Sequence, residues 1–126
     1  MPQLTVVATH DDVRRLALSL PEAAEAASGD LAFEVAGKRF VGLWRERVHP
    51  KKTKVPNPGV IVLPTADLGE KEALIASVPG VFTEPHYDGY KAVLVRLAEV
   101  GDDDLAEMVT DAWRAVAPPS LLPEVD

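Results

Sequence analysis

The sequence predicts an α+β domain in which helices pack on one face of a mainly antiparallel sheet. Periodic apolar segments follow one another in the order helix, strands, helix, strands, helix, and each group of strands contains a tight-turn signal typical of a hairpin. Hydrophobic residues at 47% and charged residues at 26% are typical of folded globular chains. The sequence has no internal repeat or linker, so we expect a single domain spanning residues 1–126.

Three segments repeat apolar residues with the spacing of an α-helix. The first starts at Thr9 and Asp12, which have the spacing of a capping box, and runs to about residue 20. The second follows Asp67, a good N-cap residue, and ends before the Pro-Gly pair at residues 79–80. The third has the clearest apolar face, formed by Leu105, Met108, Val109, Ala112, Trp113 and Val116.

Short runs of β-branched and aromatic residues predict the strands. Residues 33–35 and 39–45 are joined by the dipeptide Ala36-Gly37, and this pattern predicts a hairpin. Residues 81–83 and 91–97 flank a second turn that is rich in turn-forming residues, and they predict a second hairpin.

Two of the connecting segments are predicted to be loops. Residues 22–30 contain helix-forming residues but no large apolar anchor, and Gly29 interrupts them. Residues 48–58 contain three prolines, which cannot donate hydrogen bonds to a sheet. A short strand at residues 59–63 is expected to follow.

Charge is distributed unevenly along the chain. The formal net charge is −7, yet residues 38–54 contain seven Lys or Arg residues and one acid, which gives this basic segment a charge of +6. The remainder of the chain therefore carries −13. An even distribution of −7 would repel nucleic acids and anionic membranes, so the basic segment is the part suited to an anionic partner.

Several classes of function lack the residues that they need. The absence of cysteine excludes disulfides and thiolate chemistry. No serine stands in a G-x-S-x-G context and no phosphate-binding glycine loop occurs, so we expect no enzyme, no catalytic residue and no cofactor. The N-terminus lacks a signal-peptide pattern, and no run of about 18 apolar residues occurs, so we expect a cytoplasmic protein with no membrane partner.

Several short motifs occur in an order that resembles a known family. They are Leu20-Pro21-Glu22, Phe33-Glu34-Val35, Gly37-Lys38-Arg39-Phe40, FTEPHYDGY at residues 82–90, VLVRL at residues 93–97 and AWRAVAP at residues 112–118. Over nearly the whole chain this order resembles the MmcQ/YjbR family of small bacterial proteins. The resemblance implies a frataxin-like (CyaY-like) fold, described in that family as a double-wing DNA-binding domain.

The basic segment supplies the candidate nucleic-acid-binding residues, which are Arg45, Arg47, Lys51, Lys52 and Lys54. Cations placed along phosphates release condensed counterions, so they would bind DNA weakly, without sequence preference and in a salt-dependent manner. The alternative interpretation of the segment is a solvated surface loop. The alternative function is a module that binds a protein or a small ligand in a groove between sheet and helices, near Tyr87, Tyr90 and Trp44.

Two further patterns have both a structural and a functional interpretation. Phe40 and Trp44 share a strand face by period two, which suits either a platform for stacking bases or, as we expect, the core. Glu84, His86 and Asp88 would point the same way in an extended strand and could then hold a metal ion. The turn-forming residues beside them favour a polar hairpin tip, so we expect no metal site.

Overall fold

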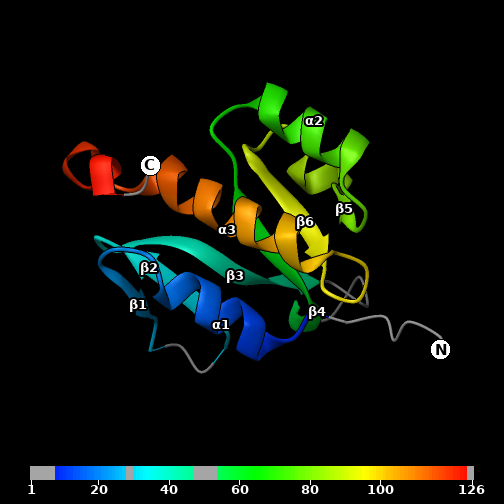
Figure 1. The fold of residues 1–126 in the computed structure, drawn as a ribbon. Coiled ribbons are helices and arrows are strands. Elements are labelled where there is room, and N and C mark those ends of the chain that lie inside the picture. The colour runs from blue at the N-terminus through cyan, green and yellow to red at the C-terminus, as the bar shows by residue number, and fades with distance from the viewer. Residues whose placement is uncertain (1–7, 28–29, 47–53, 125–126) are drawn as a thin grey trace, which may run out of the picture.

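The computed structural model describes residues 8–27, 30–46 and 54–124 of the chain (Figure 1). In chain order, its elements are α1 (His10–Leu18), β1 (Ala23–Glu25), β2 (Ala32–Val35), β3 (Lys38–Glu46), β4 (Val55–Pro64), α2 (Leu68–Ser77), β5 (Val81–Phe82), β6 (Ala92–Arg96) and α3 (Asp102–Val116). The strands form one antiparallel sheet in the order β1-β2-β3-β4-β6-β5. These elements confirm the predicted α+β class.

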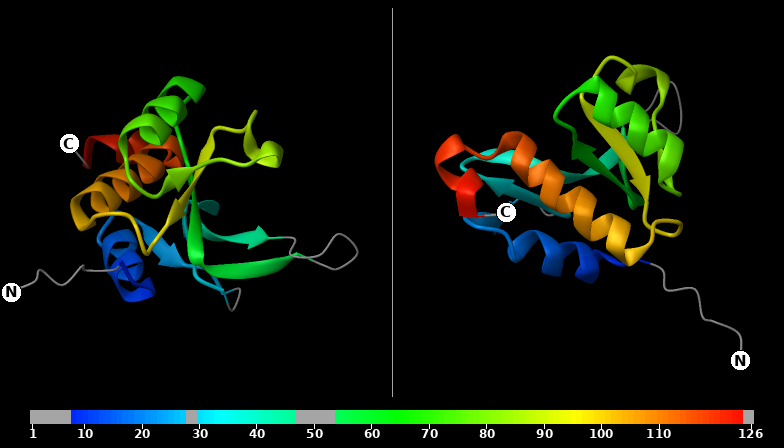
Figure 2. Two further views of the ribbon diagram at one scale, coloured as in Figure 1. Left: turned by 90° about the vertical axis from the view of Figure 1, so that its right-hand side faces the viewer. Right: turned by 45° about the horizontal axis from the view of Figure 1, so that its top comes forward.

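The α-helices pack on one side of the sheet, as Figures 1 and 2 show. α1 and α3 contact each other, and α3 crosses β3 and β4 while α1 contacts β1 and β2. α2 contacts β5 and β6, at the other end of the sheet. Within the described part of the chain, no α-helix packs on the opposite face of β3 and β4 (Figure 2).

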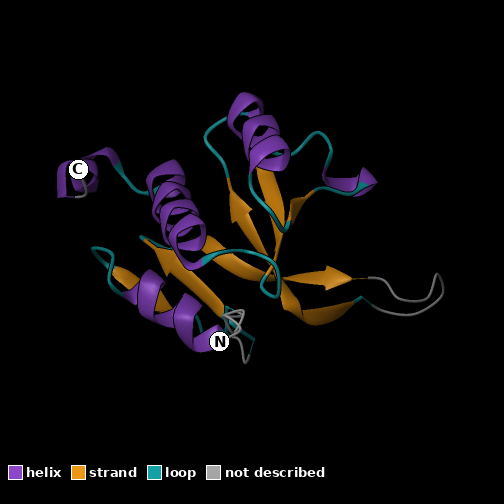
Figure 3. Cartoon of the chain, turned by 45° about the vertical axis from the view of Figure 1, so that its right-hand side comes forward, coloured by secondary structure: helices purple, strands orange, loops and turns teal. Residues whose placement is uncertain are grey.

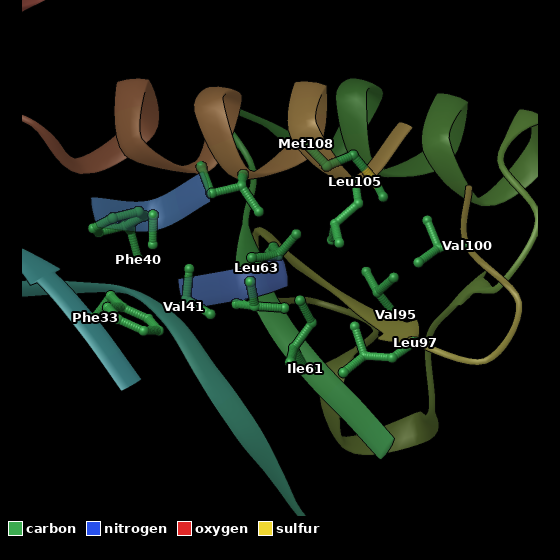
Figure 4. Close-up of a cluster of buried hydrophobic side chains, with 14 of the residues drawn as sticks. Phe33, Phe40, Val41, Ile61, Leu63, Val95, Leu97, Val100, Leu105 and Met108 are labelled. Atoms are coloured by element: carbon green, nitrogen blue, oxygen red, sulfur yellow. The ribbon is translucent and has the colours of Figure 1, made fainter. Parts of the chain in front are cut away.

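Alternation along the central strands divides the side chains between the two faces of the sheet. Ile61 and Val95 are cross-strand neighbours that belong to the core beneath α3, so the adjacent pair Val62 and Leu94 point to the opposite face. Figure 4 shows part of the core, which includes Phe33, Phe40, Val41, Ile61, Leu63, Val95, Leu97, Val100, Leu105 and Met108. Each large apolar side chain buried there contributes about 1.5–3 kcal/mol to folding.

Local sequence signals correctly predicted the start of α1 and the turn of the first hairpin. The Thr9 hydroxyl accepts a hydrogen bond from the Asp12 amide (3.2 Å), and the Thr9 amide donates to the Asp12 carboxylate (2.9 Å), so the capping box is complete. These hydrogen bonds from Thr9 lower the pKa of Asp12 below its usual value. In the first hairpin, Ala36 and Gly37 have φ values of 51° and 79°, as a type I′ turn requires.

The prediction of a loop at residues 22–30 is wrong, because Ala23–Glu25 form β1. β1 pairs with the edge of β2, and the Arg14 side chain of α1 donates to the Glu25 carboxylate (3.1 Å). The small side chains of β1 give no periodic apolar signal. The strand forms because its backbone satisfies the outer edge of β2, which is a tertiary effect.

The strand predicted at residues 59–63 begins four residues earlier than expected, at Val55. Pro56 and Pro58 therefore lie inside β4. They are tolerated because β4 pairs with β6 only from residue 60 onward, so the missing proline amides lie where β4 has a single described partner, β3.

The two-stranded end of β3 and β4, residues 44–46 and 55–58, together with Lys54 directly before β4, is called the arm below. It extends beyond the rest of the sheet, as Figure 3 shows. At its base, His10 Nε2 donates a hydrogen bond to the Pro58 carbonyl oxygen (2.6 Å), which ties the start of α1 to β4.

The segment after α3 forms a 3₁₀ helix, Pro119–Glu124, whose Leu121 and Leu122 pack against the core. Ahead of it, the Trp113 indole is fully buried and its Nε1 donates to the Pro21 carbonyl oxygen (3.0 Å). None of the helices in the described part of the chain is both long and apolar enough to cross a membrane.

Candidate functional site

The arm carries the predicted nucleic-acid-binding residues that the structure describes. Arg45 lies on β3 and Lys54 directly precedes β4, and Arg45 Nη2 donates to the Lys54 carbonyl oxygen (3.4 Å). Both side chains are exposed, so the structure brings this pair together at the surface. Arg47, Lys51 and Lys52 lie outside the described residues, and their convergence with this pair remains a prediction.

The Asp30 carboxylate lies beside Arg45. Arg45 Nη1 is 3.4 Å from Asp30 Oδ2, and both side chains remain about half exposed. A solvated pair of this kind contributes about 0–1 kcal/mol and leaves the guanidinium largely available to a second anion. Asp30 therefore reduces the positive potential of the arm without closing off Arg45.

A groove of about 450 Å³ lies beside the arm, on the sheet face that the α-helices leave uncovered. Its lining residues are Arg39, Phe40, Val41, Gly42, Leu43, Arg45, Lys54, Val62, Pro64, Tyr87 and Ala92. Three of these carry a positive charge, and none of these described residues carries a carboxylate. The sequence predicted a groove between sheet and helices, near Tyr87, Tyr90 and Trp44. The groove described here lies instead between the strands and the turn after β5, and it is lined by Tyr87 but not by Tyr90 or Trp44.

Arg39 is a groove residue that sequence reasoning did not assign. The β2–β3 register shifts between Phe33 and Glu34, and this irregularity places Phe40 and Val41 together in the core. Arg39 then lies across Gly42, where a Cβ atom would stand 3.1 Å from the Arg39 Cδ atom. Glycine inside a strand signals such a close approach, so Gly42 was the available clue.

The turn after β5 supplies the opposite side of the groove, and α2 holds this turn in place. Lys71 is 3% exposed, and its Nζ donates to the carbonyl oxygens of Tyr87 and Tyr90, the latter at 2.8 Å. The two tyrosine rings meet edge to face at a centroid distance of 5.8 Å. Lys71 therefore fixes the backbone from which Tyr87 reaches the groove.

The spacing of residues along α2 already indicates that Lys71 is buried. Lys71 precedes Leu74, Ile75 and Val78 by three, four and seven residues, so it occupies the apolar face of α2. A lysine at that position must find hydrogen-bond acceptors when the helix packs. Which acceptors it finds depends on the turn at residues 87–90, and helical spacing does not reveal them.

The Tyr87 hydroxyl stays protonated at neutral pH. Burial raises the pKa of Tyr87 above its usual value, and the neighbouring Glu84 carboxylate and Tyr90 phenol add to the rise. A protonated phenol can donate a hydrogen bond to an anion or accept one from a cation. Tyr87 therefore brings both an aromatic face and a hydroxyl to the groove.

Phe40 and Trp44 do not form a shared platform. Phe40 is fully buried in the core, as expected, whereas Trp44 is half-buried and meets Phe82 edge to face at 6.1 Å. The Arg96 guanidinium lies 3.9 Å from the centroid of the Phe82 ring. The prediction that Phe40 and Trp44 share a strand face is wrong, because the irregularity at residues 39–41 turns Phe40 to the other face of the sheet.

The turn expected to form a polar hairpin tip contains a short 3₁₀ helix, Pro85–Tyr87. The chain is therefore not extended from Glu84 to Asp88, and period-two spacing does not align these side chains. Among the described side chains, no three His, Asp or Glu residues gather in a group that could hold a metal ion.

Comparison with known proteins places this architecture in a family. The family model described as YjbR matches residues 18–115. An uncharacterised protein of Mycobacterium bovis and two of Mycobacterium tuberculosis strains are each 41% identical to the chain over 125 residues, covering 92% of it and 94% of the relative. No solved structure matches the chain. The match to more than half of the chain shows that this protein belongs to the YjbR family.

Proposed function

We propose that the chain is a non-enzymatic DNA-binding protein that contacts phosphates through the arm. The observation that carries the proposal is the pairing of Arg45 with Lys54 on an exposed two-stranded ribbon that projects from the sheet (Figure 3). A two-stranded ribbon is one of the shapes that the major groove of B-DNA admits, and cations on such a ribbon can reach the phosphates on either side.

Electrostatics set the expected character of this binding. Each phosphate neutralised contributes about −0.9 to the slope of log K against log salt concentration, so five cations limit the slope to about −4.5. The rest of the chain carries −13 and repels the duplex. The complex is therefore expected to be weak, sequence-independent and favoured by low salt.

Charge reversal within the basic segment tests the proposal. We expect the variant Lys51→Glu/Lys52→Glu/Lys54→Glu to lose at least tenfold in affinity for a short labelled duplex, measured by fluorescence anisotropy at low salt, because three phosphate contacts become repulsive. The wild-type protein should bind, and its affinity should fall as salt is added.

The matched control is Arg15→Glu/Lys91→Glu/Arg114→Glu, which reverses three exposed cations outside the basic segment and gives the same net charge. It should retain most of the affinity. Equal losses in both variants would show that net charge alone governs binding, and absence of wild-type binding at low salt would refute a role in DNA binding.

A further inference from the structure

The groove beside the arm has the dimensions of a small-molecule site. Its volume of about 450 Å³ lies within the range typical of ligand pockets, about 300–1,000 Å³. β3 and the neighbouring strands β4 and β6 form its floor, and Tyr87 closes one side, so segments far apart in the sequence surround the same space. Figures 2 and 3 show the arm and the turn after β5 extending on the same side of the sheet.

Two of the three cations that line this groove have no carboxylate partner among the described residues, and the third, Arg45, forms a half-exposed pair with Asp30. Arg39, Arg45 and Lys54 all line it, and in the described part of the chain neither Arg39 nor Lys54 forms an ion pair with a carboxylate. A second hollow, of about 340 Å³ beside α1, offers a contrast, because Arg14 and Glu25 both line it and pair with each other at 3.1 Å. Of these two hollows, the groove is the one whose charge is complementary to an added anion.

The remaining lining suits a flat apolar body. Val62, Pro64 and Ala92 present aliphatic surface, and Tyr87 adds an aromatic ring whose hydroxyl is protonated at neutral pH. Lys71 holds the Tyr87 backbone in place, so the chain that forms this side of the groove need not be ordered when a ligand arrives. A preformed apolar surface beside three cations favours a ligand that is both planar and anionic.

We propose that this groove binds a small organic anion, in which a flat ring system carries a phosphate or carboxylate group, with a size up to that of a mononucleotide. Arg39 binds the anionic group, because a guanidinium pairs with phosphate or carboxylate through two parallel hydrogen bonds. Tyr87 and the aliphatic residues contact the ring system. This site does not require that the protein bind DNA.

Two variants separate the charge of Arg39 from its position. Arg39→Gln removes the charge of an exposed side chain and should leave the fold intact. Gly42→Ala keeps the charge but adds a Cβ atom 3.1 Å from the Arg39 Cδ atom, which forces the side chain to shift. Lys91→Gln removes an exposed positive charge that does not line the groove, and it serves as the matched control.

Titration of the full chain with adenosine monophosphate, followed by amide chemical shifts and by calorimetry, tests the site. We expect shifts at Gly42, Val62 and Tyr87, an affinity at least tenfold weaker in Arg39→Gln, a smaller loss in Gly42→Ala, and no change in Lys91→Gln. Inorganic phosphate and adenosine, titrated separately, should each bind more weakly than the intact nucleotide.

Three results would overturn the inference: no shifts in the groove at millimolar nucleotide, equal losses in Arg39→Gln and Lys91→Gln, or phosphate binding as tightly as the nucleotide. Nucleotide binding in a protein that fails to bind DNA would support the groove while refuting the proposed role of the arm, so the two proposals fail separately.

Discussion

Replacing Trp113 by alanine is expected to lower the free energy of unfolding by about 3–5 kcal/mol. The indole is fully buried on α3 within the core cluster, so truncation removes apolar contacts and leaves a cavity that the packed sheet cannot fill. It also removes the donor to the Pro21 carbonyl oxygen, which lies 3.0 Å from Nε1. Urea denaturation followed by far-UV circular dichroism measures the loss.

Two further variants separate the causes of this loss. Trp113→Phe keeps most of the ring volume but not the donor, so it should cost less than the alanine variant. Ala115→Ser lies on the exposed side of the same helix and should change stability by no more than about 0.5 kcal/mol. A loss below about 1 kcal/mol in Trp113→Ala would contradict the central place of this residue in the core.

Replacing Lys71 by methionine is expected to destabilise the protein by about 2 kcal/mol and to loosen the turn between β5 and β6. Methionine retains the apolar stem but removes the ammonium donor to the carbonyl oxygens of Tyr87 and Tyr90, which then keep only their backbone donors, the amides of Tyr90 and Ala92. A hydrogen bond from a charged donor contributes about 1.5–3 kcal/mol, and two such bonds are lost. Relief of the cost of burying an ammonium offsets part of this loss. The net effect remains unfavourable because both acceptors stay in place.

Amide hydrogen exchange locates this effect. The amides of Tyr87 and Tyr90 donate within the turn, to Glu84 and Tyr87 respectively, and their exchange should accelerate in Lys71→Met more than exchange in α3. Lys91→Met, at an exposed lysine of the same region, should leave exchange unchanged. Unchanged protection in the turn of Lys71→Met would show that the lysine does not hold it.

Features fixed by neighbouring residues could be predicted from the sequence. The capping box at Thr9 and the turn at Ala36-Gly37 depend on hydrogen bonds and dihedral angles within a few residues, so their residue types reveal them. The apolar face of α3 was equally clear, because helical spacing brings its buried residues into one stripe.

Features that depend on a partner strand could not be predicted. β1 forms on the edge of β2 with no apolar pattern of its own, and the prolines of β4 are tolerated only because β6 does not pair with that end. The irregularity that turns Phe40 into the core likewise depends on the β2–β3 register. In each case the missing information lies in the neighbouring strand.

The candidate site also has one part that the local sequence predicts and one part that depends on contacts between distant segments. Arg45 and Lys54 followed from local charge, whereas Arg39, Tyr87 and Lys71 come together only because the sheet brings β3 next to β4 and the turn after β5 alongside them. Since Arg45 and Lys54 lie both on the arm and in the groove, a bound small anion would compete with phosphates for these two residues. Arg39 lines the groove but does not belong to the arm, so a substitution of Arg39 should weaken binding of the small anion without removing a phosphate contact of the arm.

The salt dependence of DNA binding tests phosphate contact by the arm most directly. Log K against log salt concentration is measured for the wild-type protein and for Arg45→Gln/Lys54→Gln with the same short duplex. We predict a negative slope for the wild type and a slope shallower by about 1.8 in the double variant, because two phosphate contacts are lost. Equal slopes in the two proteins, or wild-type binding that does not respond to salt, would contradict the proposed role of the arm.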